Sequence, residues 1–198
     1  MNLRDGAPPV AAPLGSVTTS RLDLRAFAPS DLDELADVFS HREVWEFPFG
    51  RAFTSEETRA FLDAQLDEWR ECGFGCWVAR TLVDGRLIGY LGLSVPTFLP
   101  EVLPAIEVGW RLAPAAWGKG YATEGATAAL REAFDTLGLA RVCSVPQADN
   151  PRSARVAERL GMKLSRDVLI PANERRGEIR GLFYEITRRD WSTAAREQ

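Results

Sequence analysis

The spacing of hydrophobic residues changes near the middle of the chain, and this change predicts the elements there. Apolar side chains alternate with polar or small ones over residues 106–112, the pattern of a strand with one buried face. From Ala122 to Leu137 the apolar positions recur every three or four residues, as on one face of an amphipathic helix, and Gly138 supplies a stop signal. We therefore expect a strand, a glycine-bearing turn and a helix at the centre of the chain.

The flanking sequence predicts further elements on both sides of this centre. Before it we expect a strand over 21–27, helices over 29–40 and 54–69, and a hairpin of strands 75–82 and 86–95. After it we expect a strand over 141–145, a helix over 150–160, and strands over 162–170 and 182–187. Early hairpins followed by later crossovers predict an α/β fold of mixed α+β character around one mixed sheet.

The chain ends differ from this patterned region. Residues 1–20 are rich in Ala, Pro, Gly, Ser and Thr and have no hydrophobic period, which predicts a flexible N-terminal tail. We expect one domain over 21–191 and a short C-terminal tail over 192–198. With 198 residues, of which 45% are hydrophobic and 26% charged, the chain is typical of a single globular domain with its own core.

Charge and cysteine content exclude several classes of protein. The net charge of −4 argues against a nucleic-acid backbone as the main partner. No apolar run approaches the ~20 residues of a membrane-spanning helix, and the N-terminal residues lack the apolar core of a signal peptide. Cys72, Cys76 and Cys143 have no histidine or further cysteine at metal-ligand spacing. We therefore expect no metal site, and reduced thiols in the cytoplasm.

The central turn carries chemistry of its own in Gly118-Lys119-Gly120. Glycines let the backbone approach a ligand closely, and unpaired N–H groups at a helix N-terminus bind phosphate. The Thr123 hydroxyl would add a donor. A P-loop is excluded because Lys119 is followed by Gly120, and a dinucleotide fingerprint because its third glycine is missing. The remaining interpretation is that the turn binds the pyrophosphate arm of coenzyme A. The alternative is an ordinary tight connection between a strand and a helix, with no ligand.

A family resemblance adds to this interpretation. The run EVGWRLAPAAWGKGYATEG over 107–125 resembles the cofactor segment of the GNAT N-acetyltransferases. RLDLRAF, GRLIGYLGL and NPRSARVAERLGM occur in the family's order, so the resemblance covers roughly residues 20–190. It is closest to the branch of RimJ and RimL, which acetylate N-terminal amines of ribosomal proteins. Ala115 departs from the Gln or Arg that the family often has there, although backbone N–H groups could still bind the cofactor.

The resemblance implies a fold, a cofactor and a reaction. The fold would be a single GNAT-like domain with one mixed, splayed β-sheet flanked by helices. The cofactor would be acetyl-CoA, and a primary amine would attack its thioester directly. The expected cofactor-binding residues are Trp110, Arg111, Leu112, Trp117, Gly118, Lys119, Gly120, Tyr121, Ala122, Thr123, Asn150 and Ser153. A homodimer is common among such relatives.

Two residues are candidates for proton transfer. Glu107 is the only carboxylate in an otherwise apolar strand, and partial burial would raise its pKa toward that of a useful base. Its alternative role is to pair with a cation at the sheet surface. Ser153 could protonate the departing thiolate, or it could pack against the core while Asn150 only caps the helix. Tyr121 is expected to pack rather than to act as an acid.

The acceptor is less well defined by the sequence. Trp45, Phe47 and Phe98, with Glu107, are candidates for the acceptor pocket, although aromatic residues in loops also commonly cover cores. The acceptor could be a peptide N-terminus, an amino sugar antibiotic, a polyamine or an amino-acid derivative. Two other functions stay open. One is a non-catalytic acyl-CoA-binding module, and the other is transfer of a longer acyl group such as succinyl.

Overall fold

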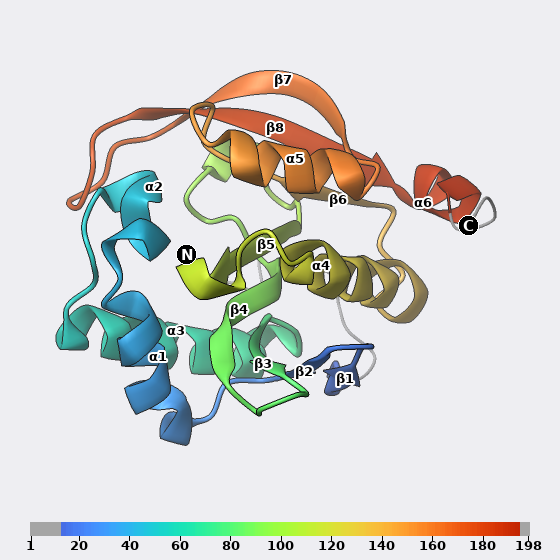
Figure 1. The fold of residues 1–198 in the computed structure, drawn as a ribbon. Helices are drawn as coiled ribbons and strands as arrows, with labels where there is room; N and C mark the ends of the chain where they lie inside the picture. The colour runs from blue at the N-terminus through green and yellow to red at the C-terminus, as the bar shows by residue number, and fades with distance from the viewer. Residues whose placement is uncertain (1–12, 195–198) are drawn as a thin grey trace.

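An eight-stranded mixed sheet forms the middle layer of the molecule (Figure 1). The computed structural model describes residues 13–194. The strands are β1 (Val17–Thr18), β2 (Leu22–Arg25), β3 (Cys76–Thr81), β4 (Leu87–Ser94), β5 (Glu107–Leu112), β6 (Arg141–Ser144), β7 (Lys163–Ile170) and β8 (Ile179–Thr187). Their order is β1-β2-β3-β4-β5-β6-β8-β7, and among these described strands only β5 and β6 pair in parallel. The predicted mixed α/β fold is confirmed.

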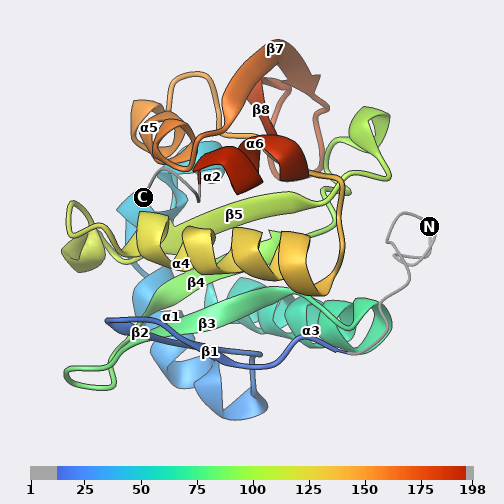
Figure 2. The same cartoon turned by 90° about the vertical axis from the view of Figure 1, so that its right-hand side faces the viewer.

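Helices cover both faces of the sheet. They are α1 (Leu32–Phe39), α2 (Glu46–Phe49), α3 (Ser55–Cys72), α4 (Tyr121–Arg131), α5 (Pro151–Arg159) and α6 (Arg188–Ala194). Short 3-10 turns span Pro29–Asp31, Arg42–Trp45, Pro100–Val102 and Pro114–Ala116. Helices α1 and α3 lie on one face, while α4 lies on the other (Figures 1 and 2). No helix of the described residues is long and apolar enough to cross a membrane.

Local sequence signals explain several of these boundaries. The Thr54 hydroxyl oxygen accepts a hydrogen bond from the Glu57 N–H, and the Glu57 carboxylate accepts one from the Thr54 N–H. The predicted capping box therefore begins α3. Asn150 caps α5, with Pro151 as its first residue. On α4, a Cβ at Gly125 would lie 2.3 Å from the Leu91 side chain, so glycine allows this helix to pack closely on β4.

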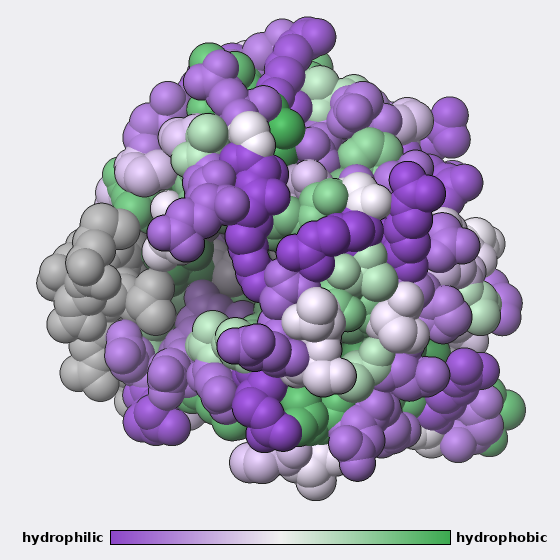
Figure 3. All heavy atoms as spheres, turned by 90° about the vertical axis from the view of Figure 1, so that its left-hand side faces the viewer, coloured by the Kyte–Doolittle hydropathy of each residue, from purple (hydrophilic) through white to green (hydrophobic). Residues whose placement is uncertain are grey.

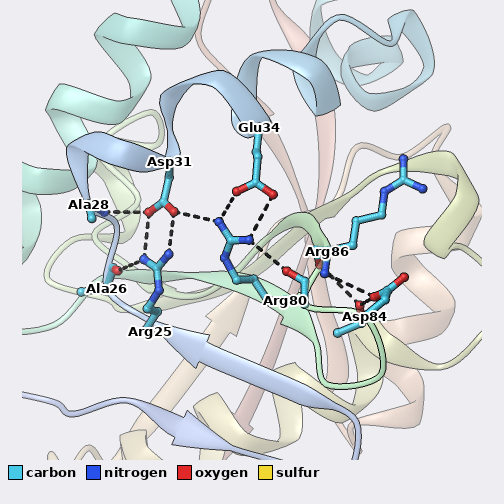
Figure 4. Close-up of polar contacts among 10 residues, drawn as sticks. Arg25, Ala26, Ala28, Asp31, Glu34, Arg80, Asp84 and Arg86 are labelled. Carbon is cyan, nitrogen blue, oxygen red and sulfur yellow. Dashed lines mark hydrogen bonds and ion pairs between the residues drawn. The ribbon is translucent and has the colours of Figure 1, made fainter.

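A buried ion network fastens α1 to strands β2 and β3 (Figure 4). Asp31 is 1% exposed and accepts two hydrogen bonds from Arg25, of 2.6 and 2.8 Å. Arg80 reaches the same carboxylate over 3.1 Å and also pairs with Glu34. The Ala28 N–H donates to Asp31 over 2.8 Å. These contacts satisfy the buried carboxylate and set the position of α1 against the sheet.

Three expectations from the sequence differ from the structure. The predicted tail over 1–20 is ordered in its described part, because β1 pairs with β2 and the buried Leu14 donates its N–H to the Gly73 carbonyl over 2.8 Å. Residues 1–12 and 195–198 lie outside the described residues. The predicted C-terminal tail begins within α6, which runs to Ala194. The central helix leaves α-geometry at Glu132–Thr136, which forms a π-helical turn.

Candidate active site

The sheet opens between β5 and β6. The ladder joins the two strands at one pair, Glu107 with Cys143, and the Cys143 N–H donates to the Ile106 carbonyl over 2.9 Å. Within residues 13–194 these strands form no second ladder pair. The other edge of β5 stays paired with β4 along its whole length. Backbone groups on the open edge of β5 are therefore placed to bond an extended ligand in the gap.

A hollow lies on the face of β5 that carries Glu107. Side chains alternate across a strand, so Glu107, Gly109 and Arg111 share one face. A Cβ at Gly109 would meet no atom within 4 Å, although this residue lies in the middle of the sheet. Viewed from the side of α2 and the β7–β8 connection, the described surface is largely hydrophilic and has a recess (Figure 3). The open space at Gly109, which we call the hollow, lies between Glu107 and Arg111 along β5 and can admit a polar acceptor.

The glycine turn leads from β5 into α4 with an exposed backbone. Gly118 and Gly120 have φ angles of 72° and 82°, which favour glycine. Gly120 is the N-cap of α4, and no side chain caps the first turn of the helix. The N–H groups at this helix start are therefore free of side-chain caps, and the helix dipole favours an anion there. This geometry allows an anion to bind through backbone N–H groups, and the binding of the coenzyme A pyrophosphate there stays a prediction.

Glu107 occupies the point at which β5 and β6 part. Its Oε1 atom accepts the Val145 N–H over 3.0 Å, and the carboxylate forms no ion pair with a described residue. Burial raises the pKa of Glu107 to about 7, against the opposing effect of the Val145 N–H. Repulsion from Glu68 adds to the rise, while Arg111 reduces it. A carboxylate with this pKa suits a general base.

Glu68 is a second buried carboxylate, which sequence reasoning missed. Its side chain extends from α3, is 6% exposed and accepts the Val95 N–H over 2.9 Å. Val95 follows Ser94, the residue that pairs with Glu107 across the β4–β5 ladder. Burial raises the pKa of Glu68 to about 7. The helical pattern alone could not identify this residue, because a charged residue in a surface helix is usually exposed.

Asn150 and Ser153 lie together at the start of α5. The Asn150 side chain accepts the Ser153 N–H and donates to the Ser153 hydroxyl oxygen, both over 3.2 Å. The helix-capping role is confirmed. Ser153 is half-buried, and its hydroxyl hydrogen has no acceptor among the described residues. The hydroxyl thus accepts one hydrogen bond and keeps its own proton for donation.

The other residues expected to bind the cofactor differ in burial and in contacts. The Trp117 indole donates to the Leu112 carbonyl over 2.8 Å, and Arg152 stacks 4.8 Å above its ring. Leu112 is buried, whereas Trp110, Ala122 and Thr123 are half-buried. Tyr121 packs on the core beneath Arg21, in keeping with a packing role. Gly118, Lys119 and Gly120 are exposed on the turn.

Arg111 extends toward the opposite side from the one expected of a cofactor ligand. Its guanidinium donates to the Phe47 carbonyl over 2.8 Å and to the Val44 carbonyl, and its Nε donates to the Tyr90 hydroxyl over 3.2 Å. It also stacks 4.1 Å from the centre of the Trp45 ring. The side chain therefore fastens the connection over residues 42–49 to β5. Only the main chain of Arg111 remains on the cofactor edge.

The aromatic residues predicted for the acceptor pocket differ in burial. Trp45 is buried and stacks on Phe53 with ring centres 3.6 Å apart, so it covers a core and does not line a pocket. Phe47 is half-buried in α2, and Phe98 is 37% exposed on the loop after β4. The structure therefore gives no support to Trp45 as a pocket residue, and no local pattern in the sequence indicates its stacking on Phe53.

The connection between β7 and β8 contacts the segment from α2 to the start of α3. Arg175 pairs with Glu57 over 2.8 Å and lies 5.1 and 5.7 Å above the rings of Phe53 and Phe49. These contacts join the C-terminal hairpin to that segment (Figure 1). No group of three or more potential metal ligands occurs in the described part of the chain.

Comparisons with known proteins agree with this geometry. Residues 21–163 match the sequence family described as an acetyltransferase (GNAT) domain. The FsC-acetyl coenzyme A-N(2)-transacetylase of Aspergillus fumigatus is 34% identical in an alignment of length 158 that covers 72% of this chain and 63% of that protein. The chain thus spans less than two thirds of this relative. Bacillus subtilis YdaF, named provisionally as a ribosomal N-acetyltransferase, is 26% identical over 86% of this chain and 93% of its own. The crystal structure of an Agrobacterium tumefaciens acetyltransferase superposes with a TM-score of 0.71 at 28% identity, covering 91% of this chain and 99% of that one.

Proposed function

The chain belongs to the GNAT acetyltransferase family, which makes it an acyltransferase that uses acetyl-CoA, and we propose that it acetylates a primary α-amine by direct attack on the thioester. The observation that carries this proposal is the position of Glu107. Its carboxylate lies where β5 and β6 part, beside the open space at Gly109. A base, a cofactor edge and an acceptor hollow thus meet at one point of the sheet.

Acetyl-CoA would lie in the gap between β5 and β6. The exposed Gly118–Gly120 turn would hold its pyrophosphate through backbone N–H groups, and the open edge of β5 would bond its pantetheine arm. When bound, the cofactor supplies an activated acetyl thioester. Because β6 moves away from β5 after Cys143, N–H groups of β5 can also donate to the thioester oxygen as negative charge develops there.

Glu107 would take the proton that the attacking amine must lose. A base works best when its pKa lies near the working pH, and the pKa of Glu107 is about 7. An α-amino group, with a pKa near ~8, is partly neutral at that pH, whereas a lysine amine near ~10.4 is almost fully charged. The carboxylate therefore suits an α-amine better than a lysine side chain.

Ser153 would give a proton to the departing thiolate. Asn150 donates to its hydroxyl oxygen over 3.2 Å and so orients the hydroxyl. The remaining hydroxyl hydrogen is free to point into the gap from the start of α5. Reprotonation by this group would complete the reaction without a covalent enzyme intermediate.

The α-amine of a peptide N-terminus is the acceptor we propose. The name of the Aspergillus relative specifies an N(2) position, and that of the Bacillus relative a ribosomal substrate. Both fit an α-amine, as does the resemblance to the RimJ and RimL branch. A cytoplasmic location belongs to the same proposal, because the three cysteines are buried and form no disulfide within the described residues.

Thiol release from acetyl-CoA across a panel of amines tests the proposal. The panel contains short peptides with free or blocked N-termini, aminoglycosides, polyamines and amino acids, and mass spectrometry locates the acetyl group. We expect release with free peptide N-termini. Binding of CoA without turnover on any amine would favour the non-catalytic module, and turnover with succinyl-CoA alone would favour the longer acyl donor. Either result would contradict the proposal.

A further inference from the structure

Arg21, which lies 98 residues before Lys119 in the sequence, binds the glycine turn through its side chain. Its Nη1 donates to the Lys119 carbonyl over 2.8 Å, and its Nε and Nη2 each lie 2.6 Å from Glu124 Oε2. Its guanidinium also stacks 4.8 Å from the centre of the Tyr121 ring. We infer that Arg21 is a positioning residue that sets the phosphate-binding turn for coenzyme A and neutralises Glu124 beside it. This inference rests on the cofactor site proposed above.

The bond to Lys119 fixes the direction of a backbone N–H. In a trans peptide the C=O and the following N–H point in opposite directions. Because the Lys119 carbonyl faces Arg21, the Gly120 N–H faces away from Arg21. Gly118 and Gly120 would otherwise leave this exposed turn with wide conformational freedom. Holding it in one conformation before binding removes part of the ordering cost that a ligand would meet.

The second role concerns charge. Glu124 lies in the first turn of α4, and its Oε1 accepts hydrogen bonds from the Thr19 hydroxyl, the Ser20 hydroxyl and the Arg21 N–H at 2.6, 2.9 and 2.8 Å. Burial would raise the pKa of Glu124, but these bonds and the Arg21 side chain hold it below its ordinary value. The carboxylate is therefore ionised at the helix end that would receive a phosphate.

An ionised glutamate at this position opposes a second anion unless a cation compensates it. A helix N-terminus attracts negative charge, and Glu124 occupies part of that field. The guanidinium of Arg21 balances the carboxylate over 2.6 Å, so the pair presents no net negative charge to the ligand. Without Arg21, the Glu124 charge would repel the pyrophosphate and the turn would lose its anchor.

Three variants separate these effects, namely Arg21→Gln, Glu124→Gln and the double variant. The control is Arg131→Gln, which removes an exposed arginine from the last turn of α4. CoA binding is measured by calorimetry. Steady-state kinetics are measured with acetyl-CoA and with S-acetylpantetheine, a donor that lacks the phosphates. Thermal unfolding verifies that each variant folds.

We expect Arg21→Gln to weaken CoA binding and raise the KM for acetyl-CoA about ten-fold, with kcat within about two-fold of the wild type and the control unchanged. With S-acetylpantetheine, Arg21→Gln should match the wild type, and the double variant should recover part of the lost CoA affinity. Unchanged CoA binding, or an equal loss with both donors, would overturn the inference. A double variant as weak as Arg21→Gln would overturn the neutralising role. If the wild type itself bound no CoA, the proposed function would fail instead.

Discussion

Glu107 and Val145 face each other across the point at which the sheet opens, and the Val145 N–H donates to the Glu107 carboxylate over 3.0 Å. The Glu107 side chain thus replaces backbone pairing at Val145, two residues beyond Cys143, which forms the single β5–β6 ladder pair of the described residues. It holds the carboxylate at the mouth of the gap while leaving its second oxygen available. The same residue thus ends the ladder and places a carboxylate on the face of β5 that is open at Gly109.

Ser153→Ala should lower kcat about ten-fold while leaving the affinity for CoA nearly unchanged. Alanine removes the proton that the thiolate would receive but keeps the helix that Asn150 caps. The effect is modest because a thiol of pKa near ~8.5 leaves readily as its anion. Stopped-flow kinetics and calorimetry measure the two quantities, and Ser165→Ala on the exposed part of β7 is the control. An unchanged kcat would show that the thiolate leaves without this hydroxyl.

Arg111→Lys should raise the KM for the amine several-fold without changing the affinity for CoA. A lysine ammonium is a point charge and cannot hold the Val44 and Phe47 carbonyls while stacking on Trp45. The connection over residues 42–49 would loosen at the acceptor side only. Kinetics at saturating acetyl-CoA measure the change. A parallel loss of CoA affinity would place the role of Arg111 on the cofactor side.

Glu68→Gln should make stability less sensitive to pH. Burial raises the pKa of Glu68 to about 7 in the folded state, so the folded chain binds more protons than the unfolded one between its ordinary pKa and 7. Stability contributed by the protonated group is present below that range and falls as pH rises through it. The variant should remove up to ~3 kcal/mol of this decline. Urea unfolding at pH 5 and pH 8 measures the difference. Exposed Glu56→Gln is the control, and an identical decline in Glu68→Gln would contradict the prediction.

Asp31→Asn should destabilise the fold by ~3 kcal/mol at neutral pH, because it leaves Arg25 and Arg80 without their shared carboxylate. Burial would raise the pKa of Asp31, but hydrogen bonds from Arg25, the Ala28 N–H and Arg80 hold it below its ordinary value. Its stabilising effect is therefore present at neutral pH and is lost in acid as the carboxylate is protonated. Denaturant midpoints compare the variant with Asp63→Asn, an exposed position on α3. Equal midpoints would show that the network contributes nothing.

Local periodicity predicted the elements that carry the proposed cofactor site. The alternation over residues 106–112 and the glycine pair of Gly118 and Gly120 correspond to β5 and to the turn with two positive φ angles. Asn150 with Pro151 predicted the start of α5. These signals depend on residues close together in sequence, so one chain is enough to identify them.

Long-range contacts account for what the sequence could not show. Arg21 and Glu124 are 103 residues apart, and neither has a local pattern that indicates its partner. Glu68 belongs to a helix that reads as amphipathic, yet its carboxylate is buried against Val95. Strand β1 has two residues and no period, so only its pairing with β2 reveals it. Each of these features depends on tertiary packing, which overrides local preference.

The pH dependence of kcat/KM for acetylation of a peptide N-terminus, compared between wild type and Glu107→Gln, tests the central claim most directly. The wild type should gain activity as pH rises through about 7, because its base works in the deprotonated form. Glu107→Gln should lose about 100-fold in kcat/KM while binding CoA normally, and it should lose the part of the rise centred at about 7. The rise due to deprotonation of the α-amine, whose pKa is near ~8, should remain. Exposed Glu101→Gln should behave as the wild type. If Glu107→Gln kept both the rate and the pH profile of the wild type, Glu107 would not be the base and the account of the site would be wrong.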